Sequence, residues 1–249
     1  MPVDPKTGAH TPKNPEKFDF DEEVLQVFDN MAYRSILGYG EAHRYMSFYA
    51  QRFTFPKYCS VWDFGTTTGH ALKSIKRGAG LHPGIRYCGL DCSPSSVEHA
   101  SKAAPFAEIY FHDLDDGLLP ASFDVERFPM AIGVFAYTLQ FMNDQNQRDR
   151  LIREAHDQLV PGGALFVLEK YRLSDQLIND MAQDAYIEIR KKNGYSLEEI
   201  YLKTEALRGS MWLNTPEHMH DLLMGVGFSQ VHTVYRHWNF GGYLATKEV

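Results

Sequence analysis

The sequence predicts an α/β fold, with a mixed, mostly parallel sheet of seven strands and helices on both faces. Two observations lead to this prediction. Apolar strand-like runs alternate with helical patterns along most of the chain, which is typical of a parallel sheet with helical crossovers. The chain then ends in two adjacent strands, at about 230–236 and 243–247, which form a final antiparallel return. The length of 249 residues suits one domain of this class.

The stretch from Cys59 to Gly69 (CSVWDFGTTTG) is the centre of this organisation. It reads as a short buried strand ended by Asp63, followed by a tight loop between Gly65 and Gly69. A helix is expected next, from about residue 70 to 77. A strand, a glycine loop and a helix bring the backbone close to a ligand and offer it free N–H groups.

The spacing Asp-x-Gly-x-x-x-Gly excludes two common motifs. It is not the dinucleotide motif, because Thr67 takes the place of the middle glycine, and no Gly-Lys-Ser/Thr follows to make a phosphate loop. It is most similar to the first motif of the class I S-adenosylmethionine (SAM)-dependent methyltransferase, or Rossmann-like, fold. There an acid equivalent to Asp63 and the glycine loop hold the amino acid end of SAM. An ordinary βα turn with closely packed glycines is the alternative.

Two amphipathic helices precede this strand, at about 19–33 and 41–53, separated by the Gly38-Tyr39-Gly40 break. We expect residues 18–54 to form a helical lid over the site. Residues 1–17 are rich in Pro, Lys, Thr and Asn and lack the apolar core of a signal peptide, so they are expected to be a flexible arm. A single domain is then expected over residues 18–249.

Two later strands end in acids. The second strand, at about 85–91, ends at Asp91, and Ser93 follows as the expected cap of a helix. In nucleoside-binding α/β folds a carboxylate here accepts hydrogen bonds from the ribose hydroxyls; the alternative is a helix-capping aspartate. The third strand, at about 107–112, is followed by Asp113, which in the SAM fold meets the adenine amino group. Asp-Asp-Gly nearby is also typical of a plain turn.

The second half of the sheet contains a long helical insertion. A fourth strand, 128–135, leads into Tyr137-Thr138-Leu139-Gln140-Phe141, and a helix follows at 143–159. Pro161-Gly162-Gly163 is expected to turn this helix into a fifth strand, 164–168, which ends at Glu169. No strand pattern appears from 171 to 214. Helices at 175–192 and 196–208 are expected to cap a substrate pocket there, and a further helix runs from Thr215 to near Gly227.

Composition excludes several classes of protein. The formal net charge of −7 argues against a broad nucleic-acid footprint. No apolar run is long enough to span a membrane. The three cysteines have no metal-ligand spacing and favour buried thiols over a disulfide framework. We therefore expect a cytoplasmic enzyme or binding protein that holds no metal, and that has no direct nucleic-acid or membrane partner.

Several stretches together resemble one family within the SAM fold, the carboxy-S-adenosyl-L-methionine (carboxy-SAM) synthases, over about residues 18–247. Members convert SAM and prephenate to carboxy-SAM, which is used to modify the wobble uridine of tRNA. The similar stretches are Phe20-Asp21-Glu22, Arg34-Ser35, Gly38-Tyr39, Tyr137-Thr138-Leu139-Gln140-Phe141, Pro161-Gly162-Gly163-Ala164-Leu165, Glu169-Lys170, Asn193-Gly194-Tyr195-Ser196 and Asn239-Phe240-Gly241.

The resemblance implies a set of site residues and a homodimer. The cofactor, SAM or carboxy-SAM, would be lined by Tyr39, Asp63, Gly65, Thr66, Thr67, Gly69, Asp91, Cys92, Asp113, Leu114 and Ala136. The substrate pocket, capped by the lid and the insertion, would be lined by Tyr39, Tyr137, Glu169 and Tyr195, which are the catalytic candidates. His70 and His112 flank the cofactor motifs, but a single histidine is more often structural.

The chain departs from the family at two positions. The family has an asparagine where this chain has Ala136. It also has an arginine, which pairs with the carboxylate of carboxy-SAM, where this chain has Thr204. Arg208 lies one helical turn further along. We expect Arg208 to face solvent in an ion pair, which would leave the pocket neutral at this point and favour plain SAM.

Three readings of the function follow. The first is a SAM-dependent methyltransferase that acts on a small molecule and is built on the carboxy-SAM synthase scaffold. Methyl transfer needs mainly in-line positioning in a dry pocket. The second is carboxy-SAM synthesis itself, with the carboxylate held in another way. The third is a SAM-binding protein without catalysis.

Overall fold

The computed structural model describes residues 22–53, 58–80 and 84–249. The expected flexible arm, residues 1–17, and the first residues of the expected lid lie outside the described residues. In the described part of the chain, none of the helices is both long and apolar enough to cross a membrane.

A seven-stranded sheet forms the centre of the molecule, in the order β3-β2-β1-β4-β5-β7-β6. β1 to β5 pair in parallel, whereas β7 pairs antiparallel with both β5 and β6. All six residues of β1 are buried, as expected for a parallel strand covered on both faces. The predicted mixed sheet is confirmed. The strands are β1 (Cys59–Phe64), β2 (Ile85–Asp91), β3 (Glu108–Phe111), β4 (Met130–Ala136), β5 (Leu159–Lys170), β6 (Gln230–His237) and β7 (Phe240–Thr246).

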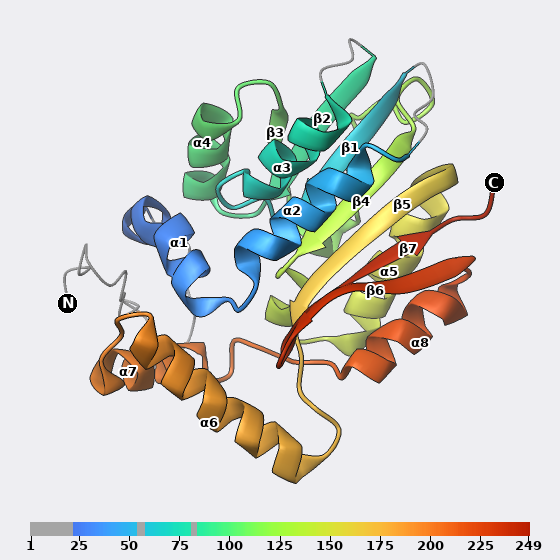
Figure 1. Ribbon diagram of the computed structural model, residues 1–249. Helices are drawn as coiled ribbons and strands as arrows, with labels where there is room; N and C mark the ends of the chain where they lie inside the picture. The colour runs from blue at the N-terminus through green and yellow to red at the C-terminus, as the bar shows by residue number, and fades with distance from the viewer. Residues whose placement is uncertain (1–21, 54–57, 81–83) are drawn as a thin grey trace.

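Helices cover both faces of the sheet (Figure 1). α2 and α3 contribute to one apolar cluster, and α5 and α8 contribute to the cluster on the opposite face. The helices are α1 (Glu22–Ser35), α2 (Tyr39–Ala50), α3 (His70–Ala79), α4 (Pro94–Ala103), α5 (Gln145–Gln158), α6 (Gln176–Lys192), α7 (Leu197–Leu207) and α8 (Pro216–Val226), with short 3₁₀ helices η1 (Leu114–Asp116) and η2 (Leu139–Phe141).

The strand order reverses beside β1, since β2 lies on one side of it and β4 on the other. Ligands of open α/β sheets bind outside the carboxyl ends of the strands at such a point. In Figure 1 the carboxyl ends of the parallel strands point toward α1, α6 and α7. The two helical segments that the sequence predicts as lid and cap therefore lie at the end of the sheet where a ligand is expected.

α2 is fixed to α3 by a close backbone approach at Gly78. A Cβ atom on Gly78 would lie 1.7 Å from the carbonyl oxygen of Ser47, so only glycine fits between the two helices. Met46 and Ala50, on the same helix as Ser47, are fully buried. α2 is thus part of the core of the sheet domain as well as of the lid.

Several predicted boundaries differ from the structure, among them those of β1, β3 and β5. Asp63 lies inside β1 and does not end it, and β3 is shorter than the predicted 107–112. Pro161-Gly162-Gly163 does not separate a helix from a strand. It is an irregular part of the longer β5, whose pairing with β4 passes from Leu159 directly to Ala164. The turn-like residues produce a bulge, with Gly162 at φ 74°.

The insertion between β5 and α8 contains the two predicted helices. Asp175 caps α6, since its side chain accepts a hydrogen bond from the N–H of Ile178 at 2.9 Å. Ser196 and Glu199 form a reciprocal capping box at the start of α7. These local caps explain why the ends of both helices are legible in the sequence.

Candidate functional site

The glycine loop between β1 and α3 has the tight geometry that its spacing predicts. Gly65 and Gly69 have φ values of 82° and 69°, and Thr67 adopts a left-handed conformation at φ 46°. A Cβ atom on Gly65 would lie 2.6 Å from the side chain of Thr138. The hydroxyl of Thr138 donates to the carbonyl of Phe64 at 2.6 Å, so the segment after β4 is held directly against the loop.

The three threonines of this loop connect it to three carboxylates on different elements. The Thr66 hydroxyl donates to Asp63 of β1 at 2.9 Å, and the Thr68 hydroxyl donates to Asp29 of α1 at 2.8 Å. The backbone N–H of Thr67 donates to Asp91 of β2 at 3.0 Å. The Thr-Thr-Thr run therefore positions the acids of the site relative to one another.

Asp63 is an acid with unused hydrogen-bonding capacity. Asp63 is 1% exposed, and its Oδ1 atom has no hydrogen-bond partner in the part of the chain that the structure describes. Burial, opposed by the hydrogen bond from Thr66 and aided by the nearby charge of Asp91, raises the pKa of this carboxyl to about 7. A buried carboxylate of this kind fits a cationic ligand group, whose charge would restore the ionised form.

Asp91 is better satisfied. One carboxylate oxygen accepts the N–H of Thr67 and the other accepts the N–H of Ser93 at 2.9 Å. Burial raises its pKa and these two backbone hydrogen bonds oppose the shift. Each carboxylate oxygen has a second lone pair, so Asp91 can accept hydroxyl hydrogens in addition. Asp91 does not cap α4, because Ser93 accepts the N–H of Ser96 in that place.

Asp113 both caps η1 and lines the site. Its Oδ1 accepts the N–H of Asp115 at 3.0 Å, which is the turn contact that the sequence left open as an alternative. Asp113 and the neighbouring Leu114 also line the cavity described below, as does Cys92 after β2.

Aromatic rings from the lid and from β4 meet on the other side of the glycine loop. Tyr39 begins α2 and is 5% exposed. Its ring centroid lies 5.9 Å from that of Tyr137, which follows Ala136 at the carboxyl end of β4. Tyr137 has φ 63°, and its hydroxyl hydrogen-bonds that of Tyr235 at 2.6 Å. Tyr137 therefore contacts both the lid, through Tyr39, and β6, through Tyr235.

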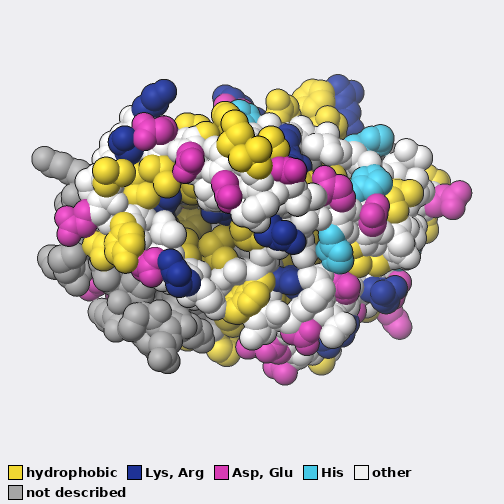
Figure 2. Space-filling view, turned by 90° about the horizontal axis from the view of Figure 1, so that it is seen from below, with side chains coloured by type: hydrophobic (Ala, Val, Ile, Leu, Met, Phe, Trp, Pro, Cys, Tyr) yellow, Lys and Arg dark blue, Asp and Glu magenta, His cyan; other side chains and the backbone are white. Residues whose placement is uncertain are grey.

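These residues surround one cavity of about 640 Å³, a size suited to a small molecule. The predicted residues that line it are Tyr39, Asp63, Gly65, Thr66, Thr67, Asp91, Cys92, Asp113, Leu114, Ala136 and Tyr137. Further walls come from the lid, from α6 and α7, and from the segment 209–212. Figure 2 shows the hollow at this end of the molecule, with mostly hydrophobic side chains inside it and Lys or Arg side chains at its walls.

Three predicted residues do not line this cavity. Glu169 is buried, and its carboxylate accepts the N–H groups of Leu139 and Gln140 at 3.0 and 3.1 Å. Glu169 therefore holds η2 in place. Burial raises the pKa of its carboxyl to about 8. Gly69 faces away from the cavity, since a Cβ atom there would lie 3.2 Å from Ala104.

Tyr195 is the third of these residues. Its hydroxyl accepts a hydrogen bond from Ser35 of α1 at 3.0 Å, and the guanidinium of Arg34 lies 4.4 Å from its ring centroid. Arg34 and Asn193 also exchange two hydrogen bonds of 2.8 Å through their side chains and carbonyls. Tyr195 therefore lies in a junction between α1 and the insertion, behind the cavity wall.

The sequence was compared with known proteins. Family models give no match. Among curated proteins, the chain is similar to the carboxy-S-adenosyl-L-methionine synthases of Actinobacillus succinogenes (32% identity, covering 92% of this chain and 93% of the relative), Shewanella frigidimarina (30%, 96% and 96%) and Aeromonas salmonicida (30%, 92% and 91%). The chain belongs to the carboxy-SAM synthase family.

Solved structures agree with the fold. The chain is similar to an O-methyltransferase family protein from Burkholderia thailandensis (TM-score 0.62, 15% identity, 92% of this chain) and to human N-acetylserotonin methyltransferase in complex with SAM (TM-score 0.57, 17% identity, 92% of this chain). The chain spans 60% and 57% of those two chains, respectively. The predicted class I methyltransferase fold is confirmed.

The departures from the carboxy-SAM synthase family have clear structural outcomes. Thr204, in place of the family arginine, is exposed, and its hydroxyl donates to the carbonyl of Ile200 at 2.7 Å. Arg208 is exposed and pairs with Glu205 at 2.6 Å, as predicted. The associated expectation of a neutral pocket is wrong, because Lys203, the residue before Thr204, lines the cavity.

Lys170 and Lys203 are the functional candidates that sequence reasoning missed. Lys203 donates to the Ser35 hydroxyl at 3.0 Å, and Lys170 lies 4.8 Å from the ring centroid of Tyr186. Among the described residues neither lysine forms a salt bridge. Burial, with nearby Arg190 in both cases, lowers the pKa of Lys170 to about 8 and that of Lys203 to about 7.

A signal for both lysines was present in the sequence. Lys170 directly follows a buried strand, at the carboxyl end where ligands bind. Lys203 shares the spacing of Ile200 and Leu207, which lie on the inward face of α7. A lysine in the apolar stripe of a helix indicates a buried charge.

Within the described residues, no group of three or more His, Cys, Asp or Glu side chains is arranged to hold a metal ion.

Proposed function

We propose that this protein binds SAM and transfers the methyl group to a small molecule that carries an acidic group. Family membership and the methyltransferase fold support the use of a SAM-type cofactor. The substrate class is proposed from the cavity itself, which has an acidic end and a basic end.

The acidic end fits the cofactor. The unpartnered Oδ1 of Asp63 would accept the ammonium of the amino acid part of SAM, and the spare lone pairs of Asp91 would accept the ribose hydroxyls. Leu114 and Asp113 would lie beside the base. The chemistry of these residues, one buried acid, one partly buried acid and a glycine loop, suits a cationic nucleoside and disfavours a dinucleotide with its two phosphates.

The basic end supports the acidic substrate, and it is the observation that carries the proposal. Lys170 and Lys203 line the same cavity as Asp63 but have no carboxylate partner in the described part of the chain. An unpaired buried ammonium is costly, and it is relieved when an anion binds beside it. A carboxylate or phosphate on the substrate would provide that anion and raise the pKa of both lysines.

The chain's own residues need to do little acid–base chemistry. When bound, SAM supplies a methyl group already activated by its positively charged sulfur. The lysines would orient the acceptor through its acidic group, while Tyr39 and Tyr137 close the wall near the glycine loop. Residues of the lid and the insertion line the cavity and would exclude water once both ligands are bound. Positioning of this kind supplies much of the rate enhancement in such a transfer.

Carboxy-SAM synthesis is a second candidate, and a specific observation favours it. Lys203 lies one residue before the position of the family arginine and projects into the cavity, whereas Thr204 does not. The lysine could hold the carboxylate of carboxy-SAM in place of the arginine. In that case the anion bound at the basic end belongs to the modified cofactor or to prephenate.

The test is a turnover assay read by mass spectrometry. The purified protein is incubated with SAM alone, with SAM and a panel of small acidic acceptors matched to their neutral amides or esters, and with SAM and prephenate. We expect S-adenosylhomocysteine and a methylated product with an acidic acceptor only. Carboxy-SAM formed only when prephenate is present would identify the second candidate instead. SAM retained unchanged with every acceptor would contradict both.

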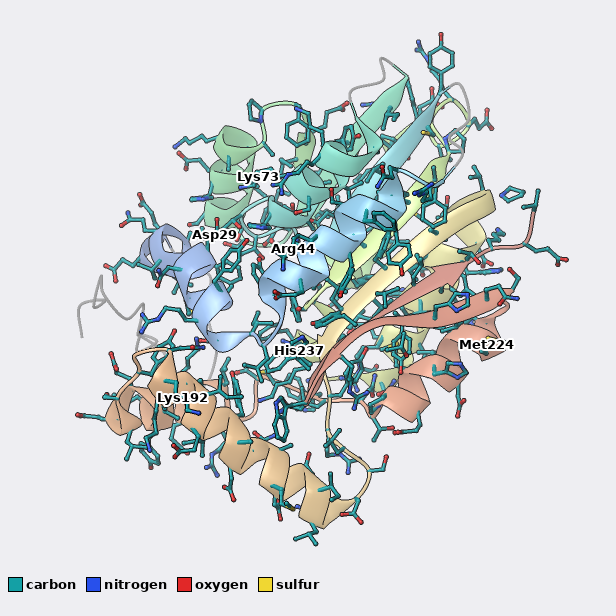
Figure 3. All side chains as sticks on the ribbon, viewed as in Figure 1. Asp29, Arg44, Lys73, Lys192, Met224 and His237 are labelled. Carbon is teal, nitrogen blue, oxygen red and sulfur yellow. The ribbon has the colours of Figure 1, made fainter. Side chains whose placement is uncertain are left out.

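Two variants separate the basic end from general effects. Lys203→Met should abolish discrimination between the acid and its neutral analogue while leaving SAM affinity unchanged. Lys192→Met is the matched control, because Lys192 is exposed on α6 and is drawn in Figure 3 on the outer helical segment. The free Lys203→Met protein should unfold close to the temperature of the parent, since the lost hydrogen bond to Ser35 is offset by removal of a partly buried ammonium that has no carboxylate partner among the described residues.

Other expectations from the sequence stay predictions. The homodimer is supported by exposed apolar side chains on α6 and α7, namely Leu177, Ile178, Met181, Leu197 and Tyr201. A cytoplasmic location and the absence of a direct nucleic-acid partner rest on composition alone.

A further inference from the structure

His43 is a buried side chain whose polar atoms have no partner among the described residues. It lies on α2, is 4% exposed, and lines the cavity. Neither of its ring nitrogens forms a hydrogen bond with residues 22–53, 58–80 or 84–249. Buried polar groups in folded proteins are nearly always satisfied, so an orphaned imidazole in a cavity wall indicates a ligand group that completes it.

The surroundings keep this imidazole in place. Its ring centroid lies 4.4 Å from that of Tyr39 and 4.2 Å from that of His70. Burial lowers the pKa of His43 well below its usual value, with His70, Lys73 and Arg77 lowering it further and Asp29 opposing them. A neutral imidazole donates one N–H and accepts at the other nitrogen. His43 can therefore give one hydrogen bond to a ligand.

The charges near His43 favour an anionic ligand group. Lys73 and Arg77 of α3 lie within electrostatic range of the imidazole, and His70 occupies the first position of the same helix. The N-terminus of α3 has no side-chain cap, so its free N–H groups add positive potential.

Among the described residues, Asp29 is the acid whose charge opposes the lowering of the His43 pKa. It lies 3.9 Å from Nδ1 of His70, accepts from Thr68, and is also within range of Lys73. Figure 3 labels Asp29 on α1 and Lys73 on α3. Because this carboxylate is already compensated, a second cation beside His43 would be disfavoured and an anion is favoured.

We infer that His43, supported by His70 and the uncapped start of α3, forms the subsite for the α-carboxylate of the bound sulfonium amino acid. The inference rests on the proposed binding of SAM. Asp63 then receives the ammonium and His43 receives the carboxylate of the same amino acid group. The two charged ends of the zwitterion are thereby bound by different groups, the ammonium by an acid on β1 and the carboxylate by a hydrogen-bond donor on the lid. Tyr39 lies against the imidazole and holds it in this orientation.

The test compares SAM with decarboxylated SAM, which keeps the sulfonium and the ammonium but lacks the carboxylate. Affinities are measured by calorimetric titration. We expect the parent protein to prefer SAM at least tenfold. His43→Phe, which keeps a ring against Tyr39, should bring the two affinities within threefold of each other, by weakening SAM alone. His43→Gln, which retains an N–H donor, should keep part of the preference.

The outcomes separate this inference from the function on which it rests. His232→Phe is the matched control, because His232 is exposed on β6, and it should leave both affinities unchanged. An equal loss of affinity for SAM and decarboxylated SAM in His43→Phe would overturn the subsite while leaving the proposed function intact. A parent protein that binds neither nucleoside would overturn both. Thermal unfolding of the free variants shows that His43→Phe is folded in the titration.

Discussion

At the scale of single residues, the site is defined by polar atoms that the fold buries without satisfying. Within the described residues, Asp63 at one end of the cavity lacks a hydrogen-bond partner on Oδ1, and His43 lacks partners on both nitrogens. Lys203 at the other end has only a hydroxyl as its hydrogen-bond partner among the described residues. Groups of this kind reduce stability in the free protein, and proteins retain them where a ligand needs them.

Asp63 makes the cofactor affinity dependent on pH. Its pKa of about 7 in the free protein means that SAM binding should weaken as the pH falls below 7, since the protonated acid cannot pair with an ammonium. Asp63→Asn should weaken SAM binding by about 10- to 100-fold, because a charge-assisted hydrogen bond contributes about 1.5–3 kcal/mol. The variant should also lose the pH dependence between 5.5 and 7. Calorimetric titration across this range measures both effects.

The same shift has a consequence for stability, with the opposite dependence on pH. The folded protein holds a proton on Asp63 between about pH 4 and pH 7, and the unfolded chain does not. The free energy of unfolding of the ligand-free parent should therefore fall as the pH rises through this window. Asp63→Asn should show a smaller fall, and the part that remains comes from Glu169, whose pKa is also raised, to about 8. A parent whose SAM affinity is constant from pH 5.5 to 7 would contradict the raised pKa.

At the scale of elements, the sequence predicts well what is encoded locally. The N-caps of α6, α7 and α8 are Asp175, Ser196 and Thr215. Each side chain accepts a hydrogen bond from the backbone N–H three residues further along the chain. The glycine loop is likewise predictable from the sequence, because Gly65 and Gly69 adopt positive φ values that favour glycine. The turn predicted at Pro161-Gly162-Gly163 is wrong. Whether such residues form a turn or a β-bulge depends on how the strand pairs with its neighbours.

The contact between α2 and α3 gives a sharp test at this scale. Gly78→Ala should destabilise the protein by more than about 3 kcal/mol, because the added methyl would overlap the carbonyl of Ser47 and the two helices would have to separate. Gly225→Ala is the matched control, since this helical glycine in α8 has no atom within 4 Å of an added Cβ. It should stabilise the protein by about 0.5–1 kcal/mol. Urea unfolding measures both, and equal effects of the two substitutions would contradict the close approach.

At the scale of the whole molecule, the site depends on contacts that no local pattern contains. Lys203 and His43 lie 160 residues apart in sequence, and the fold brings both to the wall of one cavity. Sequence reasoning placed Asp91 correctly at the end of β2, whereas Asp63 precedes the last residue of β1. It placed Glu169 and Tyr195 in the pocket by resemblance alone, and their hydrogen bonds show that they hold η2 and the junction behind the wall.

That junction determines which parts of the molecule can move together. Ser35 of α1 is hydrogen-bonded to Tyr186, Tyr195 and Lys203 of the insertion, whereas α2 is fixed to α3 by the contact at Gly78. Gly38, in a left-handed conformation, separates the two helices of the lid. Ligand entry is therefore expected to displace α1, α6 and α7 as one body, with a hinge at Gly38 and with loss of the Thr68–Asp29 hydrogen bond, while α2 remains on the sheet.

Hydrogen–deuterium exchange distinguishes this motion from the opening of the whole lid. Amides of α1, α6 and α7 should exchange faster than those of α2 in the free protein, and SAM should slow the three by a similar factor. Asn193→Ala, which removes a hydrogen bond to the carbonyl of Arg34, should make α1 exchange independently of α6 and α7. Exchange of α2 in step with α1 would place the hinge elsewhere. If α1, α6 and α7 do move as one body, a substrate that binds the insertion also orders α1 over the cofactor. The two ligands would then enter and leave through a single shared movement.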